Sequence, residues 1–141
     1  MPLHLLRHAT AGHRRPGDDA DHLRPLDERG RLQAAALPEQ YAHFGIERIL
    51  TSPFIRCRQS VEPLADALGL PVEERAELAE GTTEAATRAL AGEVAGAAAV
   101  LCTHGDILGW LLGEEPEKGS TWVVELDDGG LRRLEYLPPP A

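Results

Sequence analysis

Histidine and arginine stand at three separate positions where their side chains would suit phosphate chemistry. Arg7 directly precedes His8, and Arg56 lies three residues after Pro53, near the start of a predicted helix. Further on, His104 directly precedes Gly105. A neutral imidazole nitrogen can attack phosphorus, guanidinium groups can hold the nonbridging oxygens, and a second imidazole can donate to them. These residue types predict transfer of a phosphoryl group to a histidine, provided that the fold brings them together.

Both histidines are expected at the ends of buried strands. Residues 3–6 form a short apolar run that ends at Arg7, and residues 97–103 form a continuous apolar run that ends at His104. Continuous apolar runs are typical of strands buried on both faces of a parallel sheet. The carboxyl ends of parallel strands lie at one edge of the sheet, where ligands bind. We therefore expect both histidines to share one pocket.

The remaining sequence alternates between helix and strand signals. Apolar residues at helical spacing predict helices that begin after Asp27, at Ser52-Pro53, after Thr82 or Thr83, and at Ile107. Pro38 is expected to kink or restart the first of these helices, Gly45 to stop it, and Gly69 to close the second. Strands are expected over 46–50 and 70–72, and a hairpin over 121–126 and 131–136, before a frayed proline-rich end. This order predicts a three-layer α/β/α sandwich with a mostly parallel central sheet, as a single domain over 1–141.

Composition restricts the partners and the compartment. The chain has 141 residues, a formal charge of −9 and one lysine, Lys118. Such an acidic chain is not expected to bind a nucleic acid polymer or a membrane surface. Without a signal peptide or an apolar stretch of about 20 residues, we expect a cytoplasmic location. There Cys57 and Cys102 are expected as reduced, buried thiols, and the six histidines show no metal-ligand spacing, so neither a metal nor a cofactor is expected.

Three segments resemble the motifs of the histidine phosphatase superfamily, in the family's order. Residues 5–9 (LLRHA) resemble its Arg-His-Gly signature, residues 51–60 (TSPFIRCRQS) its Ser-Pro-x-x-Arg-x-x-Gln-Thr segment, and residues 102–105 (CTHG) its Ser-His-Gly segment. One difference is Ala9, which stands where the signature has glycine. The resemblance implies a phosphoglycerate mutase-like fold and a phosphatase that needs no metal.

The resemblance also implies a role for each candidate site residue. His8 would be the phosphorylated nucleophile, and the phosphate pocket would comprise Arg7, Arg56, His104 and Gly105. The proton donor in the family is a carboxylate in a Leu-x-Glu context between the arginine and second histidine motifs. Glu80 of residues 78–80 (LAE) fits that context best, while Glu77 and the loop residue Asp18 remain open.

Two branches of the family are similar to this chain. Its length and residues 24–30 (RPLDERG) look most like the SixA-type phosphohistidine phosphatases. Residues 17–19, 56–59 and 118–121 are similar to the phosphatase-like domain appended to certain Nudix hydrolases. The expected substrate is therefore a phosphorylated small molecule or a phosphohistidine protein.

Two other functions fit the sequence less well than a phosphatase does. A phosphoglycerate mutase-type phosphotransferase is disfavoured, because the chain lacks room for the long insertions that enclose the sugar acid. A non-catalytic domain that binds phosphorylated ligands is disfavoured by the presence of both His8 and His104. Residues 11–24 are expected to form the pocket rim, where Arg14 and Arg15 either recruit an anionic substrate or are simply solvated.

Overall fold

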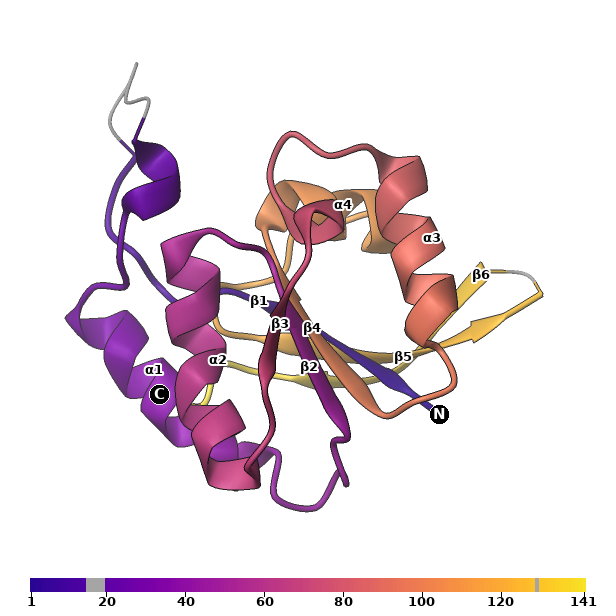
Figure 1. Cartoon of the computed structure of the whole chain (residues 1–141), viewed down its shortest axis with the longest axis horizontal. Helices are drawn as coiled ribbons and strands as arrows, with labels where there is room; N and C mark the ends of the chain where they lie inside the picture. The colour runs from indigo at the N-terminus through magenta and orange to yellow at the C-terminus, as the bar shows by residue number, and fades with distance from the viewer. Residues whose placement is uncertain (15–19, 129) are drawn as a thin grey trace.

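The computed structural model describes residues 1–14, 20–128 and 130–141 (Figure 1). Within these ranges no helix combines the length and the apolar character needed to cross a membrane. In chain order the elements are β1 (Leu3–Arg7), the 3-10 turn η1 (Asp21–Leu23), α1 (Glu28–Gln40), β2 (Arg48–Thr51), α2 (Ile55–Leu68), β3 (Val72–Glu74), the 3-10 turn η2 (Ala76–Leu78), α3 (Glu84–Val94), β4 (Ala99–Thr103), α4 (Gly105–Leu112), β5 (Thr121–Asp127) and β6 (Gly130–Leu137).

Six strands of the described chain form one mixed sheet in the order β3-β2-β4-β1-β5-β6. The first four of these run parallel, β5 is antiparallel to β1, and β6 is antiparallel to β5. Helices α1 and α2 cover one face of the sheet and α3 and α4 the other (Figure 1). The predicted three-layer sandwich with a mostly parallel sheet is confirmed.

Side chains on β1 alternate between the two faces of the sheet, as the period of two along a strand requires. Leu3 and Leu5 pack with the cluster under α3 and α4, while Leu6 packs with the cluster under α1 and α2. Full burial of a leucine side chain contributes about 2 kcal/mol. Both faces of the central strand thus stabilise the layers that hold its carboxyl end in place.

The connections leave a crevice at the carboxyl ends of β1 and β4. The chain leaves β1 through α1 toward β2, and it leaves β4 through α4 toward β5 on the other side of β1. Because these two connections diverge over opposite faces, β1 and β4 flank a topological switch point, where ligands bind in open α/β sheets. His8 follows β1 and His104 follows β4, as predicted.

Several helix boundaries follow the predicted capping residues. The Asp27 side chain accepts a hydrogen bond from the Gly30 N–H at the start of α1, and the Thr83 side chain accepts one from the Ala86 N–H at the start of α3. Gly69 ends α2 in the left-handed conformation at φ 67°. These three caps confirm the local signals that the sequence carries.

Other boundaries differ from those predicted. Helix α2 begins at Ile55 with Phe54 as its N-cap, two residues after the predicted Pro53, and the Ser52 hydroxyl accepts from the Phe54 N–H over 3.2 Å while it also contacts His104. Helix α4 begins at Gly105, two residues before the predicted start at Ile107. The proline-rich end lies beside α1, where the Gln40 side chain donates to the Pro138 carbonyl over 2.9 Å.

Candidate functional site

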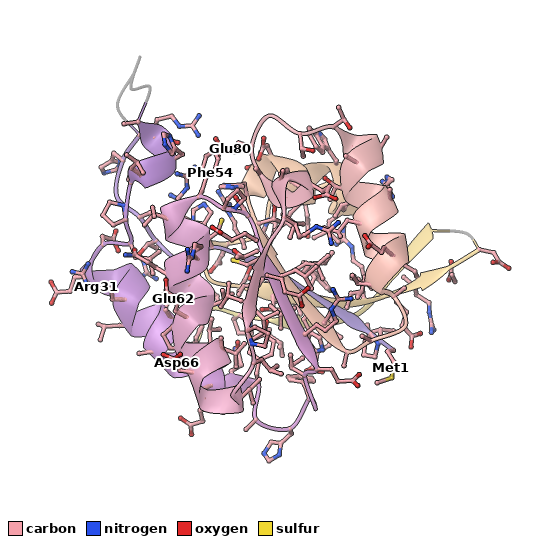
Figure 2. All side chains as sticks on the ribbon, in the orientation of Figure 1. Met1, Arg31, Phe54, Glu62, Asp66 and Glu80 are labelled. Carbon is pink, nitrogen blue, oxygen red and sulfur yellow. The ribbon has the colours of Figure 1, made fainter. Side chains whose placement is uncertain are left out.

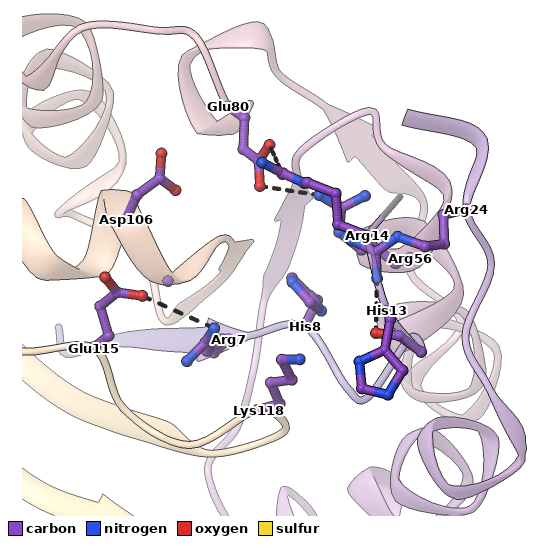
Figure 3. Close-up of a pocket in the computed structure, with 12 residues that line it drawn as sticks. Arg7, His8, His13, Arg14, Arg24, Arg56, Glu80, Asp106, Glu115 and Lys118 are labelled. Carbon is purple, nitrogen blue, oxygen red and sulfur yellow. Dashed lines mark hydrogen bonds and ion pairs between the residues drawn. The ribbon is translucent and has the colours of Figure 1, made fainter. Parts of the chain in front are cut away.

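A cavity of about 370 Å³ opens at the carboxyl ends of β1 and β4. Figure 2 shows Glu80 and Phe54 near this end of the sheet and Met1 near the other. The cavity brings together most of the predicted site residues, and it is lined by Arg7, His8, Gly12, His13, Arg14, Arg24, Arg56, Glu80, Gly105, Asp106, Glu115 and Lys118 (Figure 3). His104 lies beside His8, with the ring centroids 5.4 Å apart.

His8 is a neutral imidazole with one nitrogen fixed. Its ring is buried, and Nδ1 lies 2.8 Å from the Ala9 carbonyl oxygen. Because a carbonyl oxygen only accepts, Nδ1 carries the proton and Nε2 keeps its lone pair. Burial above all, together with the charges of His104, Arg56 and Arg7, lowers the pKa of His8 to about 3, although the hydrogen bond to Ala9 opposes this shift. At neutral pH, Nε2 is therefore available as a nucleophile.

The residue after His8 is tied to the helix that carries Arg56. The Ala9 N–H donates to the Ser60 hydroxyl oxygen over 2.9 Å, and that hydroxyl donates to the Arg56 carbonyl over 2.7 Å. Ala9 is buried and does not adopt a positive φ, so alanine is accommodated where the signature has glycine. Ser60 thus couples the position of His8 to the first turn of α2.

The loop that follows is held against the start of α1. The Asp27 carboxylate, which caps that helix, also accepts from the Thr10 hydroxyl over 2.5 Å and from the Gly12 N–H over 3.0 Å. Gly30 packs directly on the Thr10 carbonyl, since a Cβ at Gly30 would lie 1.9 Å from that oxygen. Any side chain at position 30 would therefore displace the loop beside the nucleophile.

Arg56 is fully buried in the first turn of α2 and is bound by acidic partners. Its Nη1 donates to the Asp21 carbonyl over 2.9 Å, and its Nη2 lies 3.0 Å from Glu80 Oε1 and 3.1 Å from Asp21 Oδ2. The guanidinium also stacks over the Phe54 ring, 5.0 Å from its centroid. These contacts orient the guanidinium in the cavity wall, where a phosphate oxygen could compete with the carboxylates.

The Arg7 guanidinium packs against Gly105, the first residue of α4, and binds the loop that follows this helix. Its Nη1 donates to the Pro116 carbonyl over 2.6 Å, whereas its Nη2 lies 4.0 Å from Glu115. A Cβ at Gly105 would lie 2.7 Å from the guanidinium carbon, so a glycine is required for this close approach. Burial lowers the pKa of Arg7, while the charges of Glu115 and Asp106 oppose this shift. Arg7 therefore has weaker anionic partners than Arg56.

His104 contacts Ser52 through one nitrogen and faces Glu80 with the other. Nε2 lies 2.9 Å from the Ser52 hydroxyl and Nδ1 lies 3.4 Å from Glu80 Oε1. A lone pair on Nδ1 would be repelled by that carboxylate oxygen, so the proton belongs on Nδ1. The Ser52 hydroxyl then donates to Nε2. This tautomer directs the Nδ1–H of His104, the residue that follows β4, toward Glu80 in the cavity lining.

The three candidate proton donors fall in different places. Glu80 lines the cavity, and its Oε2 lies 2.5 Å from Arg14. Glu77 is not part of the lining and pairs with Arg75 over 2.7 Å. Asp18 lies outside the described residues, as does Arg15. Arg14, which was predicted either to recruit anions or to be solvated, binds both Glu80 and Asp21.

Some residues of the site were not predicted as such. Asp106, Glu115 and Lys118 line the cavity but were not predicted to do so, whereas the lining residues Gly12, His13, Arg14 and Arg24 lie within residues 11–24, the predicted pocket rim. Arg24 and Lys118 lie in segments that resemble the family, so a signal existed for these two. Asp106 and Glu115 gave no signal, because solvated carboxylates are common in an acidic chain.

Comparison with known proteins identifies relatives of the whole chain. A model of the histidine phosphatase superfamily, branch 1, matches residues 3–89. An 8-oxo-(d)GTP phosphatase of Mycolicibacterium smegmatis is 38% identical over 96% of this chain. The phosphohistidine phosphatase SixA of Escherichia coli is 34% identical over 99% of this chain and 94% of that protein.

A solved structure agrees with these matches. A protein histidine phosphatase SixA complexed with tungstate is 31% identical, has a TM-score of 0.69, and covers 99% of this chain and 97% of its own. The mycobacterial relative is a longer protein, and this chain spans only 48% of its length.

Proposed function

The chain belongs to the histidine phosphatase superfamily, and from this premise we propose that it hydrolyses phosphomonoesters or phosphohistidine through a covalent phosphohistidine on His8. The predicted enzyme class, a phosphatase, is confirmed by the family match and by both named relatives. The catalytic steps and the substrate are our proposal. We also infer a cytoplasmic location and a single catalytic domain over 1–141.

One observation carries the mechanism: Nε2 of His8, which has no hydrogen-bond partner among the described residues, faces a cavity that is lined by Arg7 and Arg56. In the first step Nε2 attacks phosphorus, a P–N bond forms, and the bond from phosphorus to the leaving group breaks. Arg7, Arg56 and the Nδ1–H of His104 neutralise charge on the nonbridging oxygens. The neutral state of His8 allows this attack without prior loss of a proton.

Glu80 supplies the proton in this proposal. In the structure the Glu80 carboxylate binds Arg56 and Arg14, which are also the cations that an incoming phosphoryl group would attract. When substrate oxygens replace it at Arg56, the Glu80 carboxylate takes up a proton from solvent and then delivers that proton to the leaving atom. In the second step Glu80 takes a proton from water, water attacks phosphorus, and the P–N bond breaks to release phosphate and neutral His8.

The substrate lies in one of two classes. The E. coli relative is a phosphohistidine phosphatase, and the M. smegmatis relative acts on 8-oxo-(d)GTP, a nucleotide. Both classes present a phosphoryl group that fits between Arg7 and Arg56. We propose a phosphohistidine protein or a phosphorylated small molecule as the substrate, in agreement with the sequence.

The decisive experiment is to trap the intermediate. Incubation with a ³²P-labelled substrate from a panel of phosphohistidine peptide, nucleotides and sugar phosphates should label the wild type with a phosphate that acid removes and alkali does not. The His8→Ala variant should remain unlabelled. Turnover should persist in a chelator, because arginines do the work of a metal in this mechanism. Turnover without any label on His8, or turnover that a chelator abolishes and a divalent ion restores, would overturn the proposal.

A further inference from the structure

Lys118, the only lysine of the chain, lines the same cavity as His8 but lacks the kind of partner that the cavity's arginines have. It lies in the loop between α4 and β5, and Figure 3 shows it across His8 from Glu80. Arg7, Arg14, Arg24 and Arg56 each contact a carboxylate or a carbonyl oxygen. Among the residues that the structure describes, none forms a hydrogen bond or ion pair with the Lys118 amine.

The loop that carries Lys118 is anchored to the strand that carries the nucleophile. The Gly119 N–H donates to the carbonyl oxygens of Arg7 and His8 over 3.1 and 3.0 Å, and the Arg7 N–H donates to the Ser120 carbonyl over 3.0 Å. Gly119 has a φ of 85°, which favours glycine at this position. The backbone of Lys118 is therefore fixed next to Gly119, which is bonded to the carbonyl groups of Arg7 and His8. This anchoring places the Lys118 side chain at the cavity.

The charges around Lys118 are mostly positive. Burial lowers its pKa, the charges of Arg7, Arg24 and Arg56 lower it as well, and the charge of Asp27 opposes this shift. The Asp27 carboxylate is already shared by Thr10, Gly12 and Gly30. Cations that converge without a matching anion repel one another, and a bound anion relieves that repulsion. The missing element at Lys118 is therefore an anionic group.

We propose that Lys118 binds a second anionic group of the substrate, beside the phosphoryl group that His8 takes up. The transferred phosphoryl group lies between Arg7 and Arg56, and Glu80 lies on the Arg56 side of the cavity (Figure 3). A second phosphate, joined through the leaving oxygen and lying on the Arg7 side, would meet the Lys118 amine. The substrate class is a phosphoanhydride, in which two phosphates share an oxygen, and this inference rests on the proposed function of the site.

The test compares one phosphate with two. Dissociation constants for orthophosphate and for methylenediphosphonate, which is not hydrolysed, are measured by calorimetry with the wild type, Lys118→Met and Lys118→Arg. A matched control is Arg29→Met, which removes one positive charge from the exposed surface of α1. Loss of one charge-assisted contact predicts that Lys118→Met weakens diphosphonate binding by about tenfold or more, and orthophosphate binding by less than about threefold. Lys118→Arg should recover most of the difference, and Arg29→Met should change neither constant.

The outcomes separate this inference from the proposed function. If Lys118→Met weakens both ligands equally, Lys118 contacts the transferred phosphoryl group and the second-anion site is wrong. If neither ligand is affected, Lys118 does not bind substrate. Trapping of a phosphohistidine from p-nitrophenyl phosphate, which carries one phosphate, tests the proposed function alone. Failure of that trapping in the wild type counts against His8, whatever the diphosphonate result.

Discussion

Two buried histidines, His4 on β1 and His8 just after it, differ in their hydrogen bonds and in their access to the cavity. His4 lies within the strand, and its ring packs against Tyr41 and Phe44, with centroids 5.5 and 4.7 Å away. Both of its ring nitrogens are buried without a hydrogen bond in the described structure. His8 follows the end of the strand, with Nδ1 bonded to Ala9 and Nε2 facing the cavity. Burial lowers the pKa of both rings, to about 4 for His4 and about 3 for His8.

The comparison shows that burial alone does not make a nucleophile. Burial keeps both imidazoles neutral, which is a requirement for attack on phosphorus. Only His8 has one nitrogen fixed by a carbonyl group and the other directed toward cations that could hold an anion. The two sites therefore differ in hydrogen bonding and in access, and substitutions at each should affect different properties.

The largest expected effect is that of His8→Ala on turnover. Loss of the nucleophile should lower kcat/KM for p-nitrophenyl phosphate by at least about 10⁴-fold, since covalent catalysis has no substitute in this cavity. The melting temperature, followed by circular dichroism, should change by only a few degrees, because the ring lies at a cavity wall. The matched control is His4→Phe, which should keep most of the wild-type turnover. An inactive His4→Phe variant with a normal melting temperature would remove the distinction between the two histidines.

The next largest effect concerns Arg7 and Arg56, the cations that lie near His8 in the cavity. Arg7→Ala and Arg56→Ala should each lower kcat by about a hundredfold or more, the scale on which one preorganised donor to a transition-state oxyanion acts. Steady-state kinetics with p-nitrophenyl phosphate provides the measurement. Arg58→Ala serves as the control, because Arg58 lies on the same helix with its side chain 42% exposed. If Arg58→Ala lost as much activity as Arg56→Ala, the loss would reflect a general change in charge or in α2.

The proton donor should produce a smaller effect that depends on the leaving group. Glu80→Gln should slow hydrolysis of an alkyl phosphate by about a hundredfold, and that of an activated aryl phosphate by less than about fivefold, because the aryl group departs with little help. The measurement is the ratio of the two rates.

Two further variants decide between the remaining carboxylates. Glu77→Gln should leave the ratio unchanged, because Glu77 pairs with Arg75 away from the cavity. Equal losses on both substrates for Glu80→Gln, together with a selective loss for Asp18→Asn, would assign the donor to the loop after His8.

The central part of the fold and of the site could be predicted from short segments of sequence. Apolar runs that end at Arg7 and at Thr103 indicate buried strands, and the order of elements places their carboxyl ends together. Arg56 could also be placed from the sequence, because the apolar spacing of α2 is strongly periodic and Arg56 lies in its first turn, as the structure shows. Each of these inferences depends on local pattern together with one topological rule.

Contacts between distant segments could not be predicted in this way. Ser52 is predicted as a helix cap, and its hydroxyl does accept from the Phe54 N–H, but it also contacts His104, a residue 52 positions away. Likewise, Arg14 reads as a free loop cation, whereas it binds Glu80, 66 positions away. Lys118 lies in a segment that resembles the family, but its place in the cavity depends on hydrogen bonds between Gly119 and β1, which no local pattern shows. Local periodicity carries no information about such partners, which depend on how the loops are closed.

The smallest effect is on stability in acid, and it isolates His4. The folded-state pKa of His4, about 4, lies below the ordinary value of 6.5, so the unfolded chain binds more protons between these two pH values. The stability that depends on neutral His4 is therefore complete above pH 6.5 and falls as the pH drops toward 4. At pH 5 this loss is about 2 kcal/mol. In urea unfolding at pH 7.5 and 5.0, His4→Phe should lose about 2 kcal/mol less than the wild type, and at pH 7.5 it should be at least as stable, because phenylalanine leaves no unbonded ring nitrogen. An identical loss in the variant and the wild type would mean that His4 does not titrate on unfolding, and the acid sensitivity would then belong to His8 and the other ionisable groups.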